Sequence, residues 1–561
     1  MNETTNKKLE GPFQLNLENN ISTINEILEK SVDLAQRDIV FHPQKKIKAI
    51  CFYTDGLANT DAVEKLIKSL LYKTDQIHPV MDEANDPTKF VVVLRNSVME
   101  TASLKIISKI SDGIDAILSG DTLLMIDHSD KAFVSSTRGW DTRSVDEPQT
   151  EQVVRGPRDG FSESIRTNTA LVRRRIRDPL FRIEGMQIGT KSKTDVNIAY
   201  IKGTVKEGLV DEIKARLNRI KIDAILESGY IQELISDAPY SPFTTIQCTE
   251  RPDKVAAAIF EGRVAIFTDN TPFVLIAPTY FWQLLQASDD YYERYMAGSF
   301  FRMIRFLAFV ISLTLPSVFV MLVSFHQEMI PTPFALTIAS GRDVIPFPVL
   351  LEALIMEISF ELMREAGLRM PKPIGQAVSI VGSLVIGQAA VQAGIVSPSM
   401  VIIVAVTGIA SFAIPNGPAA FSIRLIRFPL LIAAGTLGLL GFAVVFAILA
   451  LHAMSLRSFG ESYLAPATPF QPADQKDSIL RFPWWSMKHL PQLANGNNTD
   501  RVGDHLTPKP PLDGEQATQT QEHNTDNNQK MKKKNSPPKN SFFKKATKLG
   551  KRTGGNEDEN Q

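Results

Sequence analysis

The feature that most constrains this sequence is a series of long uncharged segments in its second half. Residues 306–325 include no charged side chain, and further uncharged stretches cover residues 374–396, 399–414 and 430–451. An α-helix rises about 1.5 Å per residue, so about 20 residues cross the hydrocarbon core of a bilayer, which is roughly 30 Å thick. A large soluble helical core is the alternative. Four such segments close together favour a helical membrane domain, which we place at residues 300–456.

The residues before this domain alternate between strand and helix patterns. The 3.6-residue spacing of apolar side chains predicts helices over residues 61–73 and 207–222, and a run of β-forming residues predicts a strand over 47–57. Three pairs of β-rich segments joined by short turns predict hairpins, at residues 122–127 with 131–137, 181–189 with 194–204, and 263–269 with 271–278.

These patterns predict an α+β soluble region followed by an all-helical membrane domain. We place a first α/β subdomain at residues 38–145 and a second at 155–285, joined by a polar connection and preceded by a polar N-terminal extension over residues 1–37. No internal repeat is evident. Because no apolar stretch begins at Met1, we expect no secretory signal and a cytoplasmic N-terminal region.

Two segments follow the membrane domain. Residues 457–491 form a post-membrane segment, and residues 492–561 are rich in Asn, Gln, Pro and Thr, which predicts a disordered tail. Within this tail, residues 530–552 carry ten cationic side chains and no acidic one. Such a stretch either adheres to anionic lipid or is an ordinary solvated tail.

Composition and motifs give no support for an enzyme or a nucleic-acid-binding protein. The chain has 61 Lys and Arg residues against 61 Asp and Glu residues, so its net charge is zero. Cys51 and Cys248 lie far apart and form no ligand cluster, which excludes a disulfide scaffold and a cysteine-based zinc site. Residues 185–192 lack the glycine spacing of a phosphate loop, and the sequence holds no HExxH or nucleophile-elbow pattern. We expect no catalytic residue, no metal and no cofactor.

An acidic pattern occurs among the apolar segments, at residues 344–367. Glu357 and Glu361 fall on one face of a helix there, whereas Glu352 lies about 140° away from Glu357. A carboxylate at the centre of a bilayer costs about 2.5–3.5 kcal/mol, so these side chains require water, a cation or a proton. Two interpretations remain open. The helix lines a cation path or acidic ligand site, or it lies at the interface with its acids paired by Arg364 and neighbouring chains.

Small residues in the next segment predict close helix packing. A ridge of residues four apart favours packing, with a pore lining as the alternative, and consists of Gly375, Ser379, Ser383 and Gly387. The glycines of residues 435–441 predict a second packing seam. Arg424 and Arg427 either pair with the glutamates or anchor in lipid headgroups, and we favour anchoring.

The number of membrane spans is left open. Arginines near the start of the first span place that end in the cytoplasm. If residues 344–367 cross the bilayer, five spans leave the C-terminal tail outside. If they re-enter, four spans return the tail to the cytoplasm, which we favour.

Several long segments of the chain are similar to those of a known protein family. The residues between about 40 and 491 resemble the A-subunit family of spore germinant receptors (GerA type), on the strength of residues 158–179, 228–239, 346–375, 385–416, 455–470 and 481–491. The resemblance implies a multi-pass protein of the spore inner membrane that assembles with a transporter-like B subunit and a lipoprotein C subunit. It also implies a role in converting nutrient sensing into ion release and germination, with the A subunit as a homo-oligomeric ion conduit.

Residue roles follow from combining this resemblance with the patterns above. Glu352, Glu357 and Glu361 are the candidates for the ion path. The candidates for a contact with a neighbouring subunit are four arginines, Arg173, Arg174, Arg175 and Arg177. The alternatives are a transporter-like protein that itself binds the nutrient, a non-conducting membrane scaffold for the receptor complex, and a close paralogue associated with the dipicolinate channel operon.

Overall fold

The computed structural model describes residues 8–29, 31–40, 48–72, 104–139, 146–370, 387–491, 501–503 and 506. The chain divides into two compact units, Met1–Gly503 and Asp504–Gln561. The helices and strands belong to the first unit. The predicted basic stretch at residues 530–552 lies outside the described residues.

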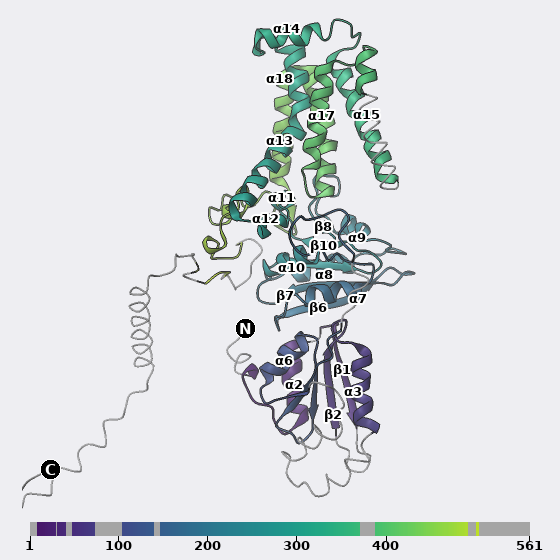
Figure 1. Ribbon diagram of the computed structural model, residues 1–561, viewed down its shortest axis with the longest axis vertical. Coiled ribbons are helices and arrows are strands. Elements are labelled where there is room, and N and C mark those ends of the chain that lie inside the picture. The colour runs from purple at the N-terminus through teal and green to yellow at the C-terminus, as the bar shows by residue number, and fades with distance from the viewer. Residues whose placement is uncertain are drawn as a thin grey trace, which may run out of the picture. The chain divides into compact units, whose positions relative to one another are not determined.

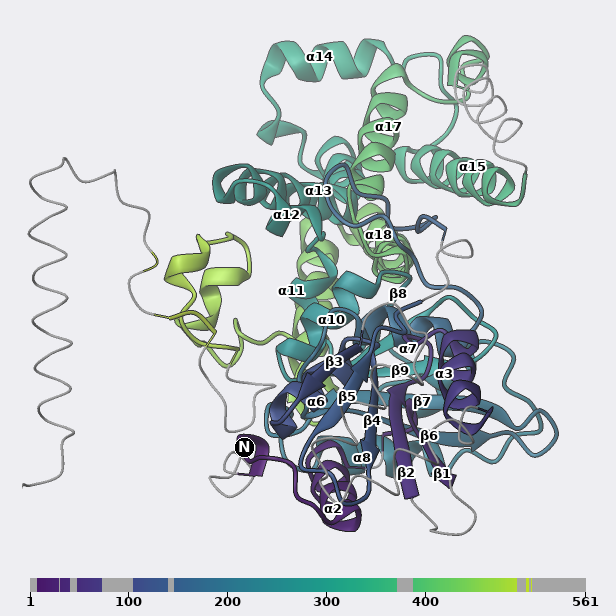
Figure 2. The ribbon, with the colours of Figure 1, turned by 60° about the horizontal axis from the view of Figure 1, so that its bottom comes forward.

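The first sheet has five antiparallel strands in the order β1-β2-β4-β5-β3, and Figure 2 shows them side by side in that order. Their bounds are β1 Leu34–Val40, β2 Lys48–Thr54, β3 Leu104–Ile107, β4 Thr122–Ile126 and β5 Ala132–Ser135. Ile50 and Phe52 of β2 face a core shared with helices α2 (Leu17–Leu28) and α6 (Ile110–Leu118). Tyr53 points to the opposite face and packs near helix α3 (Thr60–Tyr72), as the two-residue period of a strand requires.

The predicted polar extension over residues 1–37 is wrong. Helix α2 buries Leu17, Ile24 and Ile27 in the first core, and β1 pairs with β2 along its whole length. Asn16 caps the helix, since its side chain accepts a hydrogen bond from the backbone amide of Glu18 at 2.9 Å. The first folded region therefore starts well before residue 38.

The second sheet repeats this arrangement, in the order β6-β7-β9-β10-β8. Its strands are β6 Phe181–Ile188, β7 Thr194–Ile201, β8 Gln247–Thr249, β9 Val264–Thr268 and β10 Val274–Ala277. Helices α7 (Ile165–Arg173) and α10 (Pro252–Phe260) share one core with it, and α8 (Leu209–Asn218) and α9 (Ser228–Ile235) share the other. The three predicted hairpins are confirmed as β4–β5, β6–β7 and β9–β10.

The two sheets are topological copies of each other. In the part of the chain that the structure describes, each is formed by a helix, two paired strands, a helical stretch, a short edge strand, a helix and a final hairpin, and each places its third strand at the edge beside its fifth. The sequence shows no repeat at this level, because the shared feature is strand order and not residue identity.

The helical region contains α13 (Tyr295–Phe325), α14 (Thr332–Ser340), α15 (Val349–Arg369), α17 (Pro398–Phe412) and α18 (Gly417–Ser455), with a short 3₁₀ turn η2 (Gln327–Met329) after α13. Among the described residues, α13 and α18 are long and apolar enough to cross a membrane, and α17 is a shorter apolar helix. Figure 1 shows α13, α17 and α18 running side by side. Most of the predicted segment 374–396 lies outside the described residues.

The post-membrane segment returns to the second sheet. It holds the short strands β11 (Arg457–Ser458) and β12 (Glu461–Ser462) and the 3₁₀ turns η3 (Asp474–Asp477) and η4 (Trp484–Ser486). The Ser458 hydroxyl donates to the carbonyl oxygen of Thr245 at 2.6 Å, and Glu461 pairs with Lys206. Between the second sheet and α13 lie two one-turn helices, α11 (Phe281–Leu284) and α12 (Asp289–Tyr292).

Candidate functional site in the helical region

Four charged side chains form one ionic cluster between α15 and α18. Arg427 Nη1 lies 3.1 Å from Glu357 Oε2, and Arg427 Nη2 lies 3.4 Å from Glu361 Oε1. Arg424 Nη1 donates to Glu361 Oε2 at 2.8 Å. The two glutamates are four residues apart and the two arginines three apart, so each pair occupies one face of its helix and the faces meet. We call these four residues the helical cluster.

The members of the helical cluster differ in how deeply they are buried. Glu357 and Arg427 are almost wholly enclosed, with side-chain exposures of 1% each, whereas Glu361 is 26% exposed. The favoured assignment of Arg424 and Arg427 to lipid headgroups is therefore wrong. The physical reason is that an enclosed carboxylate without a cation is far more costly than a paired one, and the pairs that form join residues 63 and 70 positions apart.

Glu352 lies apart from the helical cluster, as its angular position on the helix predicts. Its Oε1 accepts a hydrogen bond from the backbone amide of Ser397 at 2.5 Å and another from the Ser397 hydroxyl. Arg342 Nη1 lies 3.2 Å from Oε2. Ser397 in turn caps α17 by accepting from the amide of Met400 at 3.2 Å. Glu352 thus ties the start of α15 to the start of α17.

Arg364 does not complete the helical cluster. Its Nη1 donates to the Ser411 hydroxyl of α17 at 3.2 Å, and its guanidinium lies 4.2 Å from the ring centroid of Phe412. The three candidate glutamates are therefore all paired within one chain, at two separate places, and their assignment to an ion path stays a prediction.

Helix α18 is interrupted at Gly438. This residue has φ 62° and ψ −139°, which side chains other than glycine rarely adopt. The interruption frees the amide of Leu439, which donates to Nε2 of His326 at 3.3 Å. A Cβ atom at Gly438 would lie 3.0 Å from the Phe325 ring, and one at Gly435 would lie 2.6 Å from Leu350 Cδ1. These glycines permit close packing, but the sequence pattern does not indicate the break.

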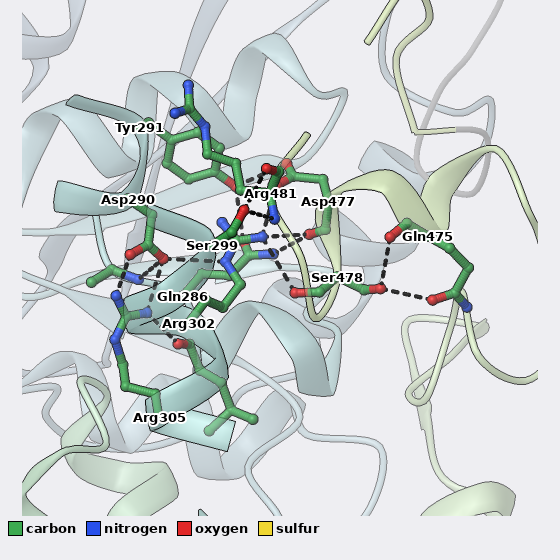
Figure 3. Close-up of polar contacts among 12 residues, drawn as sticks. Gln286, Asp290, Tyr291, Ser299, Arg302, Arg305, Gln475, Asp477, Ser478 and Arg481 are labelled. Atoms are coloured by element: carbon green, nitrogen blue, oxygen red, sulfur yellow. Dashed lines mark hydrogen bonds and ion pairs between the residues drawn. The ribbon is translucent and has the colours of Figure 1, made fainter. Parts of the chain in front are cut away.

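A second ionic cluster fixes the first turns of α13 (Figure 3). Asp290 lies between two arginines, with its Oδ2 3.2 Å from Arg302 Nε and 2.8 Å from Arg305 Nη1. Arg302 Nη1 also donates to Asp477 Oδ1 at 2.9 Å. Arg302 and Asp290 have side-chain exposures of 2% and 1%. We call Asp290, Arg302, Arg305 and Asp477 the α13 cluster.

The α13 cluster joins three parts of the chain. Asp290 belongs to α12, the arginines belong to α13, and Asp477 belongs to the post-membrane segment. Tyr291 donates from its hydroxyl to Asp477 Oδ2 at 2.9 Å, and Gln286 Nε2 donates to the Asp477 carbonyl oxygen at 2.6 Å. Burial raises the pKa of the Asp477 carboxyl above its usual range, although Arg302 beside it acts in the opposite direction. Sequence reasoning missed this cluster, because its members are separated by up to 187 residues (290 to 477).

The four arginines predicted to contact a neighbouring subunit have different environments. Arg173 is buried, and its Nε lies 2.7 Å from Asp33 Oδ2 while its Nη1 donates to the Phe181 carbonyl oxygen. The prediction is therefore wrong for Arg173, which joins α7 of the second sheet to the start of β1. Arg175 pairs with Asp159 at 2.6 Å and Arg174 is half-buried. Arg177 is exposed, so a partner contact through the remaining arginines stays a prediction.

The predicted small-residue ridge lies mostly outside the described residues, which exclude Gly375, Ser379 and Ser383. A Cβ atom at Gly387 would meet Val401 Cγ1 at an ordinary 3.7 Å, so this glycine shows no unusually close approach. Over the described ranges, no group of three His, Cys, Asp or Glu side chains is placed to hold a metal ion.

Comparisons with known proteins agree on one family. A family model described as Bacillus/Clostridium GerA spore germination protein matches residues 22–493. The uncharacterized membrane protein YfkQ of Bacillus subtilis (strain 168) is 44% identical over 500 residues, which cover 89% of this chain and 95% of that protein. Spore germination protein KA of the same organism is 42% identical over 495 residues, covering 88% and 89%. The crystal structure of the N-terminal domain of the A subunit of the Bacillus megaterium spore germinant receptor GerK3 matches 48% of this chain and 98% of that domain, at 33% identity and a TM-score of 0.39.

Proposed function

Because the chain belongs to the GerA family of spore germination proteins, we propose that it is the A subunit of a spore germinant receptor in the spore inner membrane. In this proposal it assembles with the B and C subunits and converts the sensing of a nutrient into ion release. The soluble sheets lie on the cytoplasmic side, and the helical region supplies the part of an oligomer through which ions pass.

The observation that carries the proposal is the helical cluster. A protein that only anchors its soluble region to a membrane has no need of four charges within apolar helices, and such charges commonly mark ion or substrate paths. Glu357 and Arg427 are enclosed, whereas Glu361 remains partly exposed beside Arg424. In the resting state we propose that the arginines hold α15 against α18. A conformational change received from the other subunits separates these charges and leaves Glu361 facing the ion path.

The experiment is performed in spores, with potassium release after nutrient addition as the readout. Glu361→Gln removes the partly exposed charge while preserving the shape of the side chain. The matched control is Glu365→Gln, one turn further along α15, where the glutamate pairs with Arg369 and both side chains are exposed. Receptor assembly is measured in parallel by the amount of each subunit in the inner membrane.

The expected result is that Glu361→Gln slows potassium release at least tenfold with normal assembly, while Glu365→Gln behaves as the unmodified chain. A non-conducting scaffold predicts unchanged release in both variants whenever assembly is normal. That outcome would contradict the ion-path role but leave receptor membership standing.

A further inference from the structure

A cavity of about 380 Å³ lies between α11 and the post-membrane segment. Apolar surface predominates in it, and its lining includes Tyr280, Trp282, Ala465, Pro466 and Met487. Cavities of this size with an apolar lining and a few polar groups are typical of small-molecule sites. The family resemblance and the two ionic clusters assign no role to this cavity.

Tyr280 and Trp282 form the aromatic side of the cavity. Tyr280 is buried, and its hydroxyl oxygen has no hydrogen-bond partner in the part of the chain that the structure describes. That hydroxyl is closed to solvent, so Tyr280 offers a bound molecule apolar surface. Trp282 donates its indole N–H to the Leu464 carbonyl oxygen at 3.1 Å, which leaves its ring as apolar surface.

Lys476 lines the cavity without a carboxylate partner among the described residues. Lys476 Nζ donates to the Ser486 carbonyl oxygen at 3.3 Å, and no carboxylate of the described residues lies within 4 Å of it. The carboxylates are already engaged, since Glu261 lies 3.2 Å from Arg501 and Asp477 lies 2.9 Å from Arg302. Asp474 also lines the cavity and has an interaction of its own. The lining therefore favours an acidic group near Lys476.

We infer that this cavity binds a small anionic amphiphile, a molecule with a flat apolar body and one carboxylate, sulfonate or phosphate group. The apolar body packs against Trp282 and Tyr280, and the acidic group faces Lys476. Such a group belongs either to a free solute or to an anionic lipid whose headgroup enters from the membrane surface.

The same cavity adjoins the α13 cluster. Gln286, Asp477 and Ser478 line it. Asp477 and Ser478 hold Arg302 through the Asp477 carboxylate and the carbonyl oxygens of both residues (Figure 3). A bound molecule therefore rests on the residues that fix the first turns of α13. Its effect on germination depends on the proposed receptor function, but its binding does not.

The test uses the full chain in nanodiscs of phosphatidylcholine, with calorimetric titration of naphthalene-2-sulfonate as the probe. Uncharged 2-naphthol and cationic 2-naphthylmethylamine have the same ring system and a different head group. We expect the sulfonate to bind at one site per chain and about tenfold more tightly than naphthol. The reason is that a hydrogen bond to a charged group contributes more binding free energy than a hydrogen bond to a neutral group. Absence of saturable sulfonate binding, or equal binding of all three probes, overturns the inference.

Charge reversal supplies the specific control. Lys476 is exposed, so the Lys476→Glu variant is expected to fold. Because its charge is reversed, it should bind the sulfonate at least tenfold more weakly and the naphthylmethylamine more tightly than the unmodified chain does. The matched control is Lys221→Glu, an exposed lysine outside the cavity, which should change neither affinity. Unaltered probe preference in Lys476→Glu overturns the assignment of the acidic group to Lys476.

Two further measurements separate the possible sources and consequences. In nanodiscs containing phosphatidylglycerol, a lipid occupant competes with the sulfonate and weakens its apparent affinity, whereas a free-solute site leaves it unchanged. Amide hydrogen exchange over residues 295–302 is expected to slow when the sulfonate binds. Unchanged exchange in the saturated chain would contradict coupling to α13 and leave the binding site itself intact.

Discussion

Replacing Arg427 by methionine is expected to remove the cation that holds an enclosed carboxylate. Glu357 is fully buried, and Arg427, with Nη1 3.1 Å from Glu357 Oε2, is its ion-pair partner among the described residues. Methionine keeps much of the apolar stem, so the change is mainly electrostatic. Breaking a buried pair by removing one partner costs about 3–5 kcal/mol, because the other charge is left without compensation. Glu361 is less affected, since it retains Arg424 at 2.8 Å.

A double-mutant cycle distinguishes the loss of charge compensation at Glu357 from a loss of packing as the cause of the destabilisation. Glu357→Leu combined with Arg427→Met removes both charges, and exchanging a buried ion pair for apolar residues is often neutral or stabilising by about 1–4 kcal/mol. The double variant should therefore be much more stable than Arg427→Met alone. The free energy of unfolding is measured in mixed micelles by circular dichroism, with Arg369→Met as the matched control, since Arg369 is 79% exposed and should change stability by less than about 0.5 kcal/mol.

Two results would refute this reasoning. If Arg427→Met costs no more than Arg369→Met, the buried pair does not form in the protein. If the double variant loses as much as the sum of its two single variants, the two side chains contribute independently and the charge on Glu357 is not what Arg427 compensates.

Three further predictions concern other parts of the chain. Arg173→Lys loses the forked contacts to Asp33, so the free energy of unfolding should fall by about 1–3 kcal/mol in a urea titration, and an effect below 0.5 kcal/mol would contradict the structural role assigned to Arg173. Gly438→Ala should lower thermal stability, because the backbone conformation at this position costs an alanine about 1–3 kcal/mol. The control Gly417→Ala in the same helix should leave thermal stability unchanged, since no other atom lies within 4 Å of the new Cβ. Equal melting temperatures for the two glycine variants would argue against the break in α18. Burial acts to raise the pKa of Glu29, but hydrogen bonds from Lys202 and Arg182 outweigh it and hold the pKa below its ordinary value near 4.5. The stabilisation from Glu29 is therefore present above that value and is lost as the pH falls through the lower folded-state pKa. Glu29→Gln should flatten the acid limb of the stability profile, and an unchanged limb would exclude this contribution.

Much of the soluble fold could be predicted from local patterns. The three hairpins and helices α3 and α8 were identified from two-residue and 3.6-residue periodicity, which reflects which face of each element is buried. Helix α2 carries the same signal, since Leu17, Ile21, Ile24 and Leu28 are spaced three and four apart, but the polar residues between them concealed it. The family resemblance is confirmed by the match over residues 22–493, because long matching segments are specific in a way that short motifs are not.

The sequence by itself determined where apolar helices form, where strands turn back, and that acidic side chains occur within the helical region. Only the tertiary structure decided which charges meet. Glu357 pairs with Arg427, 70 residues away, and Arg302 pairs with Asp477, 175 residues away. The physical reason is that periodicity reports the face a side chain occupies on its own element, whereas the partner of a buried charge depends on which elements pack together.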